Sequence, residues 1–329
     1  MNLKNQNIIN EYLGNKELIN NLFNQLKKNT LQNSILLFGN RGIGKATLAY
    51  IIFKKFFNIE TEKNIHEFLH PNFHYLSRIF DSSKNDFKKN ISIDQIRLCN
   101  DYIKLTSLND QPRIILVDSI DEFNLNASNS LLKILEEPPK NVYFFLISHQ
   151  INLILPTIKS RCIKYNVKEP DFSTFNEIIR INYPEISQLE VKDLFYLTSA
   201  SPGNAINFIN YNFTNIKDEI ISILLNKKLL NNDLINFSNN IYKNNDQYMI
   251  FIYLFKFILL NIIKCQNNIY DYNELSFKNE IIELSQCFSH DRIDDIVDYL
   301  DENENLINIY NLDKKIFIIN CFSKLLKKQ

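Results

Sequence analysis

The stretch that decides the fold is Ser34–Tyr50, whose sequence is SILLFGNRGIGKATLAY. A short apolar run comes first, and Gly39, Gly42, Gly44 and Lys45 follow it in the pattern G-x-x-x-x-G-K. The 329 residues include only five glycines, and three of them lie in this loop. The pattern is that of a P-loop, in which backbone N–H groups and the N-terminus of the following helix bind the phosphates of a nucleotide.

The residues on both sides of the loop give it the strand–loop–helix setting that this motif requires. The apolar run 34–38 predicts a strand, and Leu48, Ile51 and Ile52 fall on one face of a helix behind the loop. A tight glycine turn that binds no ligand is the alternative. The flanking pattern favours a phosphate site, in which Lys45 reaches the outer phosphates.

The wider hydrophobic pattern predicts two kinds of structure in one chain. In the first half, helical stripes alternate with apolar runs that predict strands at 34–38, 73–76, 113–118, 142–147 and 163–167. Such alternation indicates a parallel sheet covered by helices on both faces. Beyond Pro170 only helical patterns follow. We therefore predict an α/β domain over 1–168, a small helical domain over 169–214 and a second helical domain over 215–329.

The composition argues against several classes of protein. The 37 basic and 37 acidic side chains cancel, which is not the balance of a strongly basic nucleic-acid binder. The five cysteines are scattered without a C-x-x-C pair, which predicts reduced thiols and neither a zinc ribbon nor a redox motif. The N-terminus has no apolar signal-peptide core. The apolar run 248–260 is too short to span a membrane and predicts a buried helix.

The ligands that would hold a magnesium ion beside the phosphates are incomplete. Ala46 stands where a magnesium-binding P-loop has serine or threonine, and Thr47 lies about 100° further round the helix. Asp118 ends a predicted strand, where a carboxylate would hold the metal. The next residue is Ser119, whereas a hydrolysing enzyme of this type has a glutamate that positions water.

An alternative strand register would place a different acidic pair at the site. Asp121 and Glu122 could end the strand only if Asp118 and Ser119 lay inside it, in the buried part of the sheet. We expect the strand to end at Asp118.

Three stretches in the same half of the chain form a more specific signature. They are 129–139 (NSLLKILEEPP), 142–148 (VYFFLIS) and 155–162 (LPTIKSRC). In this order they resemble the bacterial DNA polymerase III clamp-loader subunits of the AAA+ family. The resemblance runs from Gly14 to Val167, and a weaker similarity continues through the following helical segment to Gly203. It implies an AAA+ P-loop domain followed by a helical lid and a helical collar, which forms part of a ring of five subunits.

Within that family the chain most resembles the delta-prime subunits. The ATP-hydrolysing gamma/tau subunits have a zinc-binding cysteine cluster after the P-loop, Asp-Glu at the position of Asp118-Ser119, and a lid arginine at the position of Gly203. This sequence has none of the three. The resemblance therefore implies a subunit without ATPase activity of its own, without zinc and without a required cofactor. It leaves open whether ATP or ADP still binds without hydrolysis at a degenerate site made of Gly39, Gly42, Gly44, Lys45, Thr47 and Asp118.

The resemblance gives Arg161 a role of its own. In this family the S-R-C arginine is an arginine finger, which reaches the ATP of a neighbouring subunit and stabilises charge on the transferred phosphoryl group. An ordinary surface or ion-paired arginine is the alternative. The implied partners are the gamma/tau and delta subunits, the sliding beta clamp and primed DNA, whose backbone phosphates are contacted without sequence readout. The implied location is the bacterial cytoplasm, and no membrane partner is expected.

Two other functions compete with a non-hydrolysing assembly subunit. The chain could be an active ATPase of the gamma/tau type, or an unrelated P-loop nucleotide kinase. The kinase hypothesis gives no reason for the L-E-E-P-P and S-R-C stretches.

A zinc-protease pattern, H-E-x-x-H, occurs at His66–His70. That chemistry needs both histidines on one face of a continuous helix, and Pro71 directly after the motif disfavours such a helix. We therefore predict no zinc site there. His149 and His290 are interpreted as ordinary polar residues.

Overall fold

The structure is a computed structural model that describes residues 14–60, 65–82, 86–104, 111–226, 232–310 and 312–326. The chain divides into two compact units. The first comprises Met1–Pro184 together with Ala200–Gly203, and the second comprises Glu185–Ser199 together with Asn204–Gln329. The predicted three-domain division, with boundaries at 168 and 214, stays a prediction.

The first unit is built around a five-stranded sheet in the order β2-β5-β6-β1-β7, with every neighbouring pair parallel. The strands are β1 (Ser34–Phe38), β2 (Phe73–Ser77), β5 (Arg113–Asp118), β6 (Val142–Ser148) and β7 (Ile163–Asn166). All five predicted strands are present, each within a residue or so of its predicted bounds. The parallel sheet predicted from the apolar runs is confirmed.

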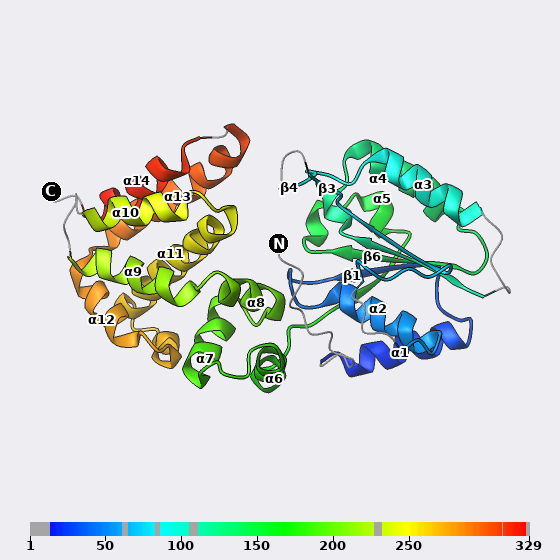
Figure 1. Cartoon of the computed structure of the whole chain (residues 1–329), viewed down its shortest axis with the longest axis horizontal. Coiled ribbons are helices and arrows are strands. Elements are labelled where there is room, and N and C mark those ends of the chain that lie inside the picture. Colours follow the sequence, from blue (N-terminus) through cyan, green and yellow to red (C-terminus); the bar gives the residue numbers. More distant parts are fainter. Residues whose placement is uncertain are drawn as a thin grey trace. The chain divides into compact units, whose positions relative to one another are not determined.

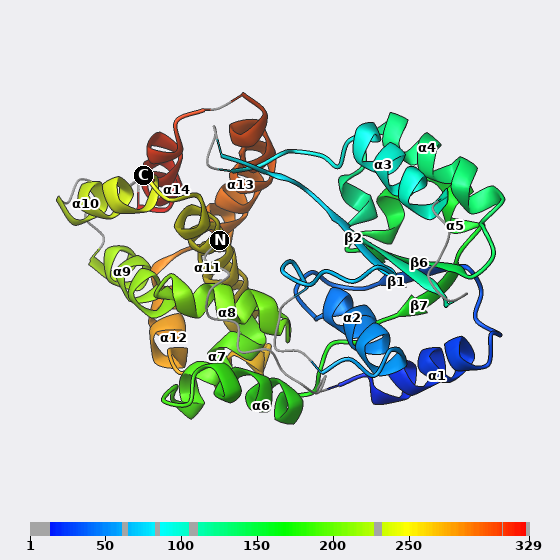
Figure 2. The same cartoon turned by 45° about the vertical axis from the view of Figure 1, so that its right-hand side comes forward.

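Helices cover both faces of this sheet (Figure 1). On one face lie α1 (Lys16–Lys27) and α2 (Lys45–Phe56), and on the other lie α3 (Ile93–Lys104), α4 (Leu125–Glu136) and α5 (Pro156–Lys159). Figure 2 shows the same two layers from a second direction. Because successive strand residues point to opposite faces, each strand contributes to two cores. In β1, Ile35 and Leu37 join the core under α1 and α2, whereas Leu36 joins the core under α3 and α4.

Smaller elements complete the first unit. They are the hairpin of β3 (Phe80–Asp81) and β4 (Asp86–Phe87), the helix α6 (Phe172–Asn182), and two 3-10 helices, η3 (Ile120–Glu122) and η4 (Ile151–Leu153). The sequence pattern gave no sign of the hairpin or of η3. Ser92 and Gln95 form a capping box before α3, with Gln95 N donating to Ser92 Oγ and Ser92 N donating to Gln95 Oε1.

The second unit is helical throughout its described residues, as the sequence predicts. Its elements are α7 (Gln188–Leu197), most of α8 (Pro202–Asn210), α9 (Phe213–Asn226), α10 (Asn232–Ile241), α11 (Asn245–Gln266), η5 (Tyr270–Glu274), α12 (Lys278–Cys287), α13 (His290–Tyr310) and α14 (Lys314–Leu326). Its core includes buried aromatic rings of Phe237, Phe251, Phe255 and Phe322, with centroids 5.2–6.0 Å apart.

The helix α11 is longer than its apolar run predicted. It has 22 residues and is apolar enough to cross a membrane by length and composition, so the expectation that the segment is too short was wrong. Of its most apolar stretch, 56% is buried within the protein, and the core helix of a soluble protein can be equally long and apolar. Phe251 and Phe255 of α11 are fully buried in the aromatic core. The predicted buried helix is therefore confirmed.

Candidate phosphate-binding site

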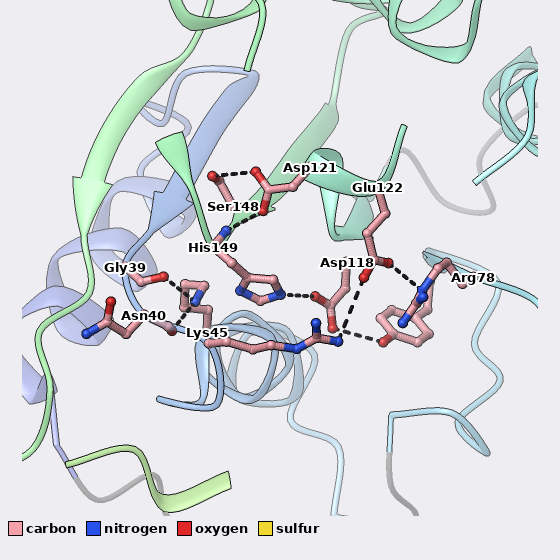
Figure 3. Close-up of polar contacts among 11 residues, drawn as sticks. Gly39, Asn40, Lys45, Arg78, Asp118, Asp121, Glu122, Ser148 and His149 are labelled. Carbon is pink, nitrogen blue, oxygen red and sulfur yellow. Dashed lines mark hydrogen bonds and ion pairs between the residues drawn. The ribbon is translucent and has the colours of Figure 1, made fainter. Parts of the chain in front are cut away.

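The candidate site lies at the carboxyl ends of β1, β5 and β6 in the first unit. The glycine loop follows β1, Asp118 ends β5, and His149 directly follows β6. In an open parallel sheet, ligands bind at these ends where the strand order reverses, and here the order reverses at β1. Figure 3 shows Gly39, Lys45 and Asp118 gathered at this point with residues of η3 and β6. The fold thus brings together most of the site residues predicted from the sequence.

Lys45, the first residue of α2, binds the carbonyls of the loop that precedes it. Its Nζ donates to Gly39 O at 2.8 Å and to Asn40 O at 2.5 Å (Figure 3). An ammonium has three donors, so one N–H remains for an anion. Only 3% of Lys45 is exposed, and burial lowers its pKa to about 8 despite the opposing attraction of Asp118 and Asp121. A bound phosphate would supply the negative charge that this buried cation lacks.

Gly39 allows the loop to turn directly against the end of β7. Its φ is +146°, and a Cβ on this residue would lie 2.5 Å from the carbonyl oxygen of Val167. That distance is far inside van der Waals contact, so a side chain would displace backbone. Val167 N donates to Phe38 O at 2.8 Å, which fixes the same approach. Glycine is therefore required here by packing as well as by conformation.

Asp118 ends β5, so the alternative register through Asp121 and Glu122 is not the one adopted. The hydroxyl of Tyr75, on the neighbouring strand β2, donates to Asp118 Oδ2 at 3.1 Å. Burial raises the pKa of Asp118, while the Tyr75 hydrogen bond and the positive charge of Lys45 act against that increase. The carboxylate is thus held by protein groups and disfavoured in its charged form.

The two acidic residues of η3 have structural partners of their own. Asp121 accepts a 2.8 Å hydrogen bond from Ser148 Oγ and another from His149 N, which joins η3 to the end of β6 (Figure 3). Glu122 forms an ion pair with Arg78 at 2.8 Å. Neither carboxylate replaces Asp118 at the strand end.

His149 is a site residue that the sequence analysis missed. Its Nε2 lies 3.9 Å from Asp118 Oδ1, and its Nδ1 is buried without a hydrogen-bond partner in the described part of the chain. Burial, followed by the charges of Lys45 and Arg41, lowers the pKa of His149 to about 3, so the ring is neutral at physiological pH. Its place directly after a buried strand was the signal available in the sequence.

The residues present do not fit a magnesium ion. Ala46 packs against the core under α2 and has no hydroxyl, and Thr47 is exposed on the same helix. The hydroxyl of Ser119 is buried, without a hydrogen-bond partner among the described residues. The loop and Lys45, by contrast, keep the donors that hold phosphate. The chemistry that this arrangement supports is anion binding rather than metal-assisted hydrolysis.

A segment from the far end of the unit, Ser201–Gly203, closes onto the outside of the loop. Ser201 Oγ donates to Arg41 O at 2.8 Å, and Gly203 N donates to Gly42 O at 2.9 Å. Together with the two bonds made by Lys45, four consecutive loop carbonyls, 39–42, each accept a hydrogen bond from the chain itself. The loop is therefore held in one conformation from both sides.

Arg161 is bonded away from the phosphate loop. It lies just after α5, with Nη1 donating to Thr157 O at 2.9 Å and Nη2 to Glu136 Oε1 at 2.8 Å. About a third of its side chain is exposed, 35%. The structure thus separates Arg161 from the other predicted site residues and presents it at the surface of the unit.

The H-E-x-x-H stretch is not helical. Residues 65–67 form a turn, and His70 makes an isolated bridge with Phe73. His70 Nδ1 accepts from Asn72 N, and the His70 ring packs among Phe53, Phe57 and Phe68. The two histidines therefore do not share a helix face. Within the described residues no group of three His, Cys, Asp or Glu side chains could hold a metal ion.

The strand order, the phosphate loop and the helical second unit define the AAA+ class of P-loop proteins. A solved structure of a DNA polymerase III gamma subunit-related protein from Thermotoga maritima has this fold, with a TM-score of 0.52 over 94% of this chain and 99% of that one. Because the two sequences are only 16% identical, this similarity supports a shared fold and nothing further.

Sequence comparisons show which proteins of this class the chain is similar to. The family model "DNA polymerase III, delta subunit" matches residues 14–171. The DNA polymerase III subunits delta' of Buchnera aphidicola subsp. Baizongia pistaciae and of Pseudomonas aeruginosa are 38% identical over 101 residues and 33% identical over 118. These matches cover 31% and 36% of this chain, and 30% and 36% of the relatives. The stretch 14–171 of this chain is thus similar to subunits of the DNA polymerase III clamp loader.

The comparisons do not single out one type of subunit. The DNA polymerase III subunit gamma of Buchnera aphidicola subsp. Baizongia pistaciae is 25% identical over 292 residues, which cover 84% of this chain and 74% of that protein. The higher identities belong to the delta' relatives, although the chain spans only about a third of the length of the two described above.

Proposed function

We propose that this chain is a delta-prime-type subunit of a bacterial clamp loader, one that does not hydrolyse ATP and that helps to load a sliding clamp onto primed DNA. The observation that supports this most directly is the missing metal site. Ala46 has no hydroxyl to offer, and the hydroxyl of Ser119 is buried at the position where a hydrolysing relative would have glutamate. A triphosphate bound here would lack the loop hydroxyl that binds magnesium and a residue to position water.

The proposed partners are the gamma/tau and delta subunits, the beta clamp and primed DNA. The helices of the second unit would form this subunit's part of an oligomeric collar. Contacts with DNA would be made to backbone phosphates, without sequence readout, as the family resemblance implies. The proposed site of action is the bacterial cytoplasm.

Arg161 would act in trans on the ATP of a neighbouring motor subunit. Its surface position supports this role, since a finger must leave its own unit to reach another. Its two hydrogen bonds use two of the five guanidinium N–H donors. The other three are enough to bind phosphoryl oxygens in the bidentate manner that arginine favours.

The subunit would require no cofactor for this function. Its phosphate loop would nevertheless bind ATP or ADP without hydrolysis. The buried ammonium of Lys45 supports such binding, because burial lowers its pKa and a phosphate beside it would favour the charged form. The nucleotide would then stabilise the unit rather than react.

A second candidate function is a hydrolysing motor of the gamma/tau type. The long match to a subunit named gamma favours it, because that match extends over most of this chain. The incomplete metal site speaks against it.

ATP turnover by the purified chain separates the two candidates. We expect no hydrolysis above the background of a Lys45→Ala variant, with or without primed DNA. Turnover that depends on Lys45 would contradict the non-hydrolysing role and support the motor.

The finger is tested in a clamp loader reconstituted with the ATP-hydrolysing subunit of the same organism. Arg161→Ala should lower DNA-stimulated hydrolysis, by about 10³-fold at the adjoining site, while assembly measured by gel filtration stays intact. Arg97→Ala is a matched control, because Arg97 is also exposed and also forms an ion pair, with Asp94 at 3.1 Å. Equal rates for the two variants would exclude the finger.

A further inference from the structure

We propose that Glu136 is a positioning residue for Arg161, and that it holds the guanidinium ready for the neighbouring nucleotide. The inference rests on the proposed function, since it assumes that Arg161 acts in trans. It starts from one contact, the 2.8 Å ion pair between Glu136 Oε1 and Arg161 Nη2. The two residues are 25 positions apart, so the fold rather than the local chain brings them together.

The position of Glu136 follows from the way α4 ends. The helix runs to Glu136, and Pro138 and Pro139 prevent it from continuing. The core side of α4 is fixed by Leu131 and Leu135, both buried. Glu136 is therefore carried on a rigid element at its last turn, while its carboxylate remains about half exposed, at 51%.

Arg161 is fixed from a second side by its own short helix. Pro156 begins α5, whose Thr157 carbonyl accepts the Nη1 hydrogen bond. Cys162, the next residue along the chain, is buried in the core under α3 and α4 and anchors the backbone. With Nη1 held by Thr157 and Nη2 held by Glu136, both terminal nitrogens of the planar guanidinium are tied to different elements. Two such contacts define the orientation of the plane, which a single contact would not.

Orientation has a catalytic value for a side chain that must meet a transition state on another subunit. An arginine side chain that is mobile before binding loses rotamer entropy when it binds, which weakens the interaction. An arginine that is already fixed by other contacts avoids this entropic cost. The three N–H donors outside these two bonds can bind phosphoryl oxygens while both anchors stay in place. Glu136 would thus raise the rate constant of the adjoining site without contact with the nucleotide.

The partial exposure of the pair fits a positioning role better than a stabilising one. Exposed ion pairs contribute little to folding. Loss of Glu136 should therefore leave the unit folded, and any effect on rate can be attributed to Arg161.

The test uses the reconstituted complex and five variants of this chain, one of which is Arg161→Ala. Glu136→Ala should lower kcat for DNA-stimulated hydrolysis by about tenfold with an unchanged KM for ATP, because the neighbour's own loop binds the nucleotide. Glu136→Gln keeps an oxygen acceptor and should stay within about twofold of the parent rate. Glu137→Ala, a neighbouring exposed glutamate, should have no effect. In an Arg161→Ala background, Glu136→Ala should cause no further loss.

The variants distinguish a failure of the proposed function from a failure of the positioning role alone. An Arg161→Ala variant with full activity would remove the proposed function and the role of Glu136 with it. A slow Arg161→Ala variant beside a fully active Glu136→Ala variant would remove only the positioning role. A faster Glu136→Ala variant would also overturn it, because Glu136 would then sequester the finger.

The physical premise can be measured on this chain alone. In the parent protein, nitrogen-15 NMR of arginine side chains should find hindered rotation of the Arg161 guanidinium, and Glu136→Ala should abolish it. Free rotation in the parent protein would contradict the anchoring, whatever the kinetics of the complex.

Discussion

The backbone N–H of Gly203 donates a hydrogen bond to the carbonyl oxygen of Gly42, with 2.9 Å between the two atoms. A Cβ on Gly203 would lie 2.9 Å from that oxygen and 3.0 Å from Gly42 Cα. Both obstacles are backbone atoms of the phosphate loop, which cannot rotate aside as the end of a side chain can. Glycine at 203 therefore permits a close backbone contact that any other residue would prevent.

We predict that Gly203→Ala lowers the free energy of unfolding by about 1–3 kcal/mol, because the methyl group overpacks the contact with the loop. The measurement is urea denaturation followed by circular dichroism. Ser201→Ala is the companion variant, since it removes the hydrogen bond to Arg41 O without adding bulk and should cost about 1 kcal/mol. A Gly203→Ala protein as stable as its parent would show that the segment moves off the loop without cost.

We predict that ADP binds to the isolated chain with an affinity that changes less than about twofold when magnesium is removed. Ala46 offers no metal ligand, so the affinity rests on the loop and on Lys45. Lys45→Ala should weaken binding by about 10- to 100-fold, the value of one charge-assisted hydrogen bond. Lys55→Ala, an exposed lysine on the same helix, should leave it unchanged. Isothermal titration calorimetry with and without EDTA provides the measurement.

We predict that the affinity for ADP depends on pH through the same lysine. Lys45 binds phosphate as the ammonium, and its pKa in the free chain is lowered to about 8. The bound phosphate raises that pKa, so the complex takes up a proton above pH 8. Affinity should be constant below that value and fall by up to about tenfold per pH unit above it. An affinity that stays constant from pH 7 to pH 9.5 would mean that another group binds the phosphate.

Much of the first unit could be predicted because its strands are buried on both sides and therefore leave unbroken apolar runs. The stretches 113–118 and 142–147 are such runs, and both form strands, the second one residue longer than expected. The glycine loop was equally clear, because close backbone approach is confined to few residue types. The short hairpin of β3 and β4 left no such signal, since two-residue strands are too short for an alternating pattern.

The site was predictable only as far as its residues belong to a known motif. His149 was interpreted as an ordinary polar residue because a lone histidine has no local pattern, and only the strand order brings it 3.9 Å from Asp118. Tyr75 was missed for the same reason, since it reaches Asp118 across two neighbouring strands. The contact between Glu136 and Arg161 depends on the packing of α4 against α5, which no sequence period encodes.

We predict that Asp118→Asn raises the free energy of unfolding at pH 7. Burial raises the pKa of Asp118 above its ordinary value of 3.8, so the folded protein binds the proton more tightly than the unfolded chain does. The charged carboxylate therefore lowers stability at a pH above the folded pKa, and this penalty disappears as the pH falls below 3.8. The difference between variant and parent should shrink accordingly in denaturation series from pH 7 towards pH 3.5. A variant less stable than its parent at pH 7 would mean that attraction to Lys45 outweighs burial.

We predict that Asp193→Ala destabilises the second unit by about 1–3 kcal/mol, the value of lost hydrogen bonds to a charged acceptor. Asp193 lies on α7 with only 3% exposed, and it accepts bonds from Ser276 N at 2.8 Å and Ser276 Oγ at 2.5 Å. Burial raises the pKa of this carboxyl, so the two bonds must offset a desolvation cost, and the net loss stays moderate.

Ser276→Ala removes only the hydroxyl bond and should cost less than Asp193→Ala. The two changes together should cost less than the sum of the single losses, because both remove the same interaction. Urea denaturation of the parent, the two single variants and the double variant measures this coupling. Strictly additive losses would mean that Asp193 stabilises the unit through other contacts. One such contact is its electrostatic attraction to Lys217.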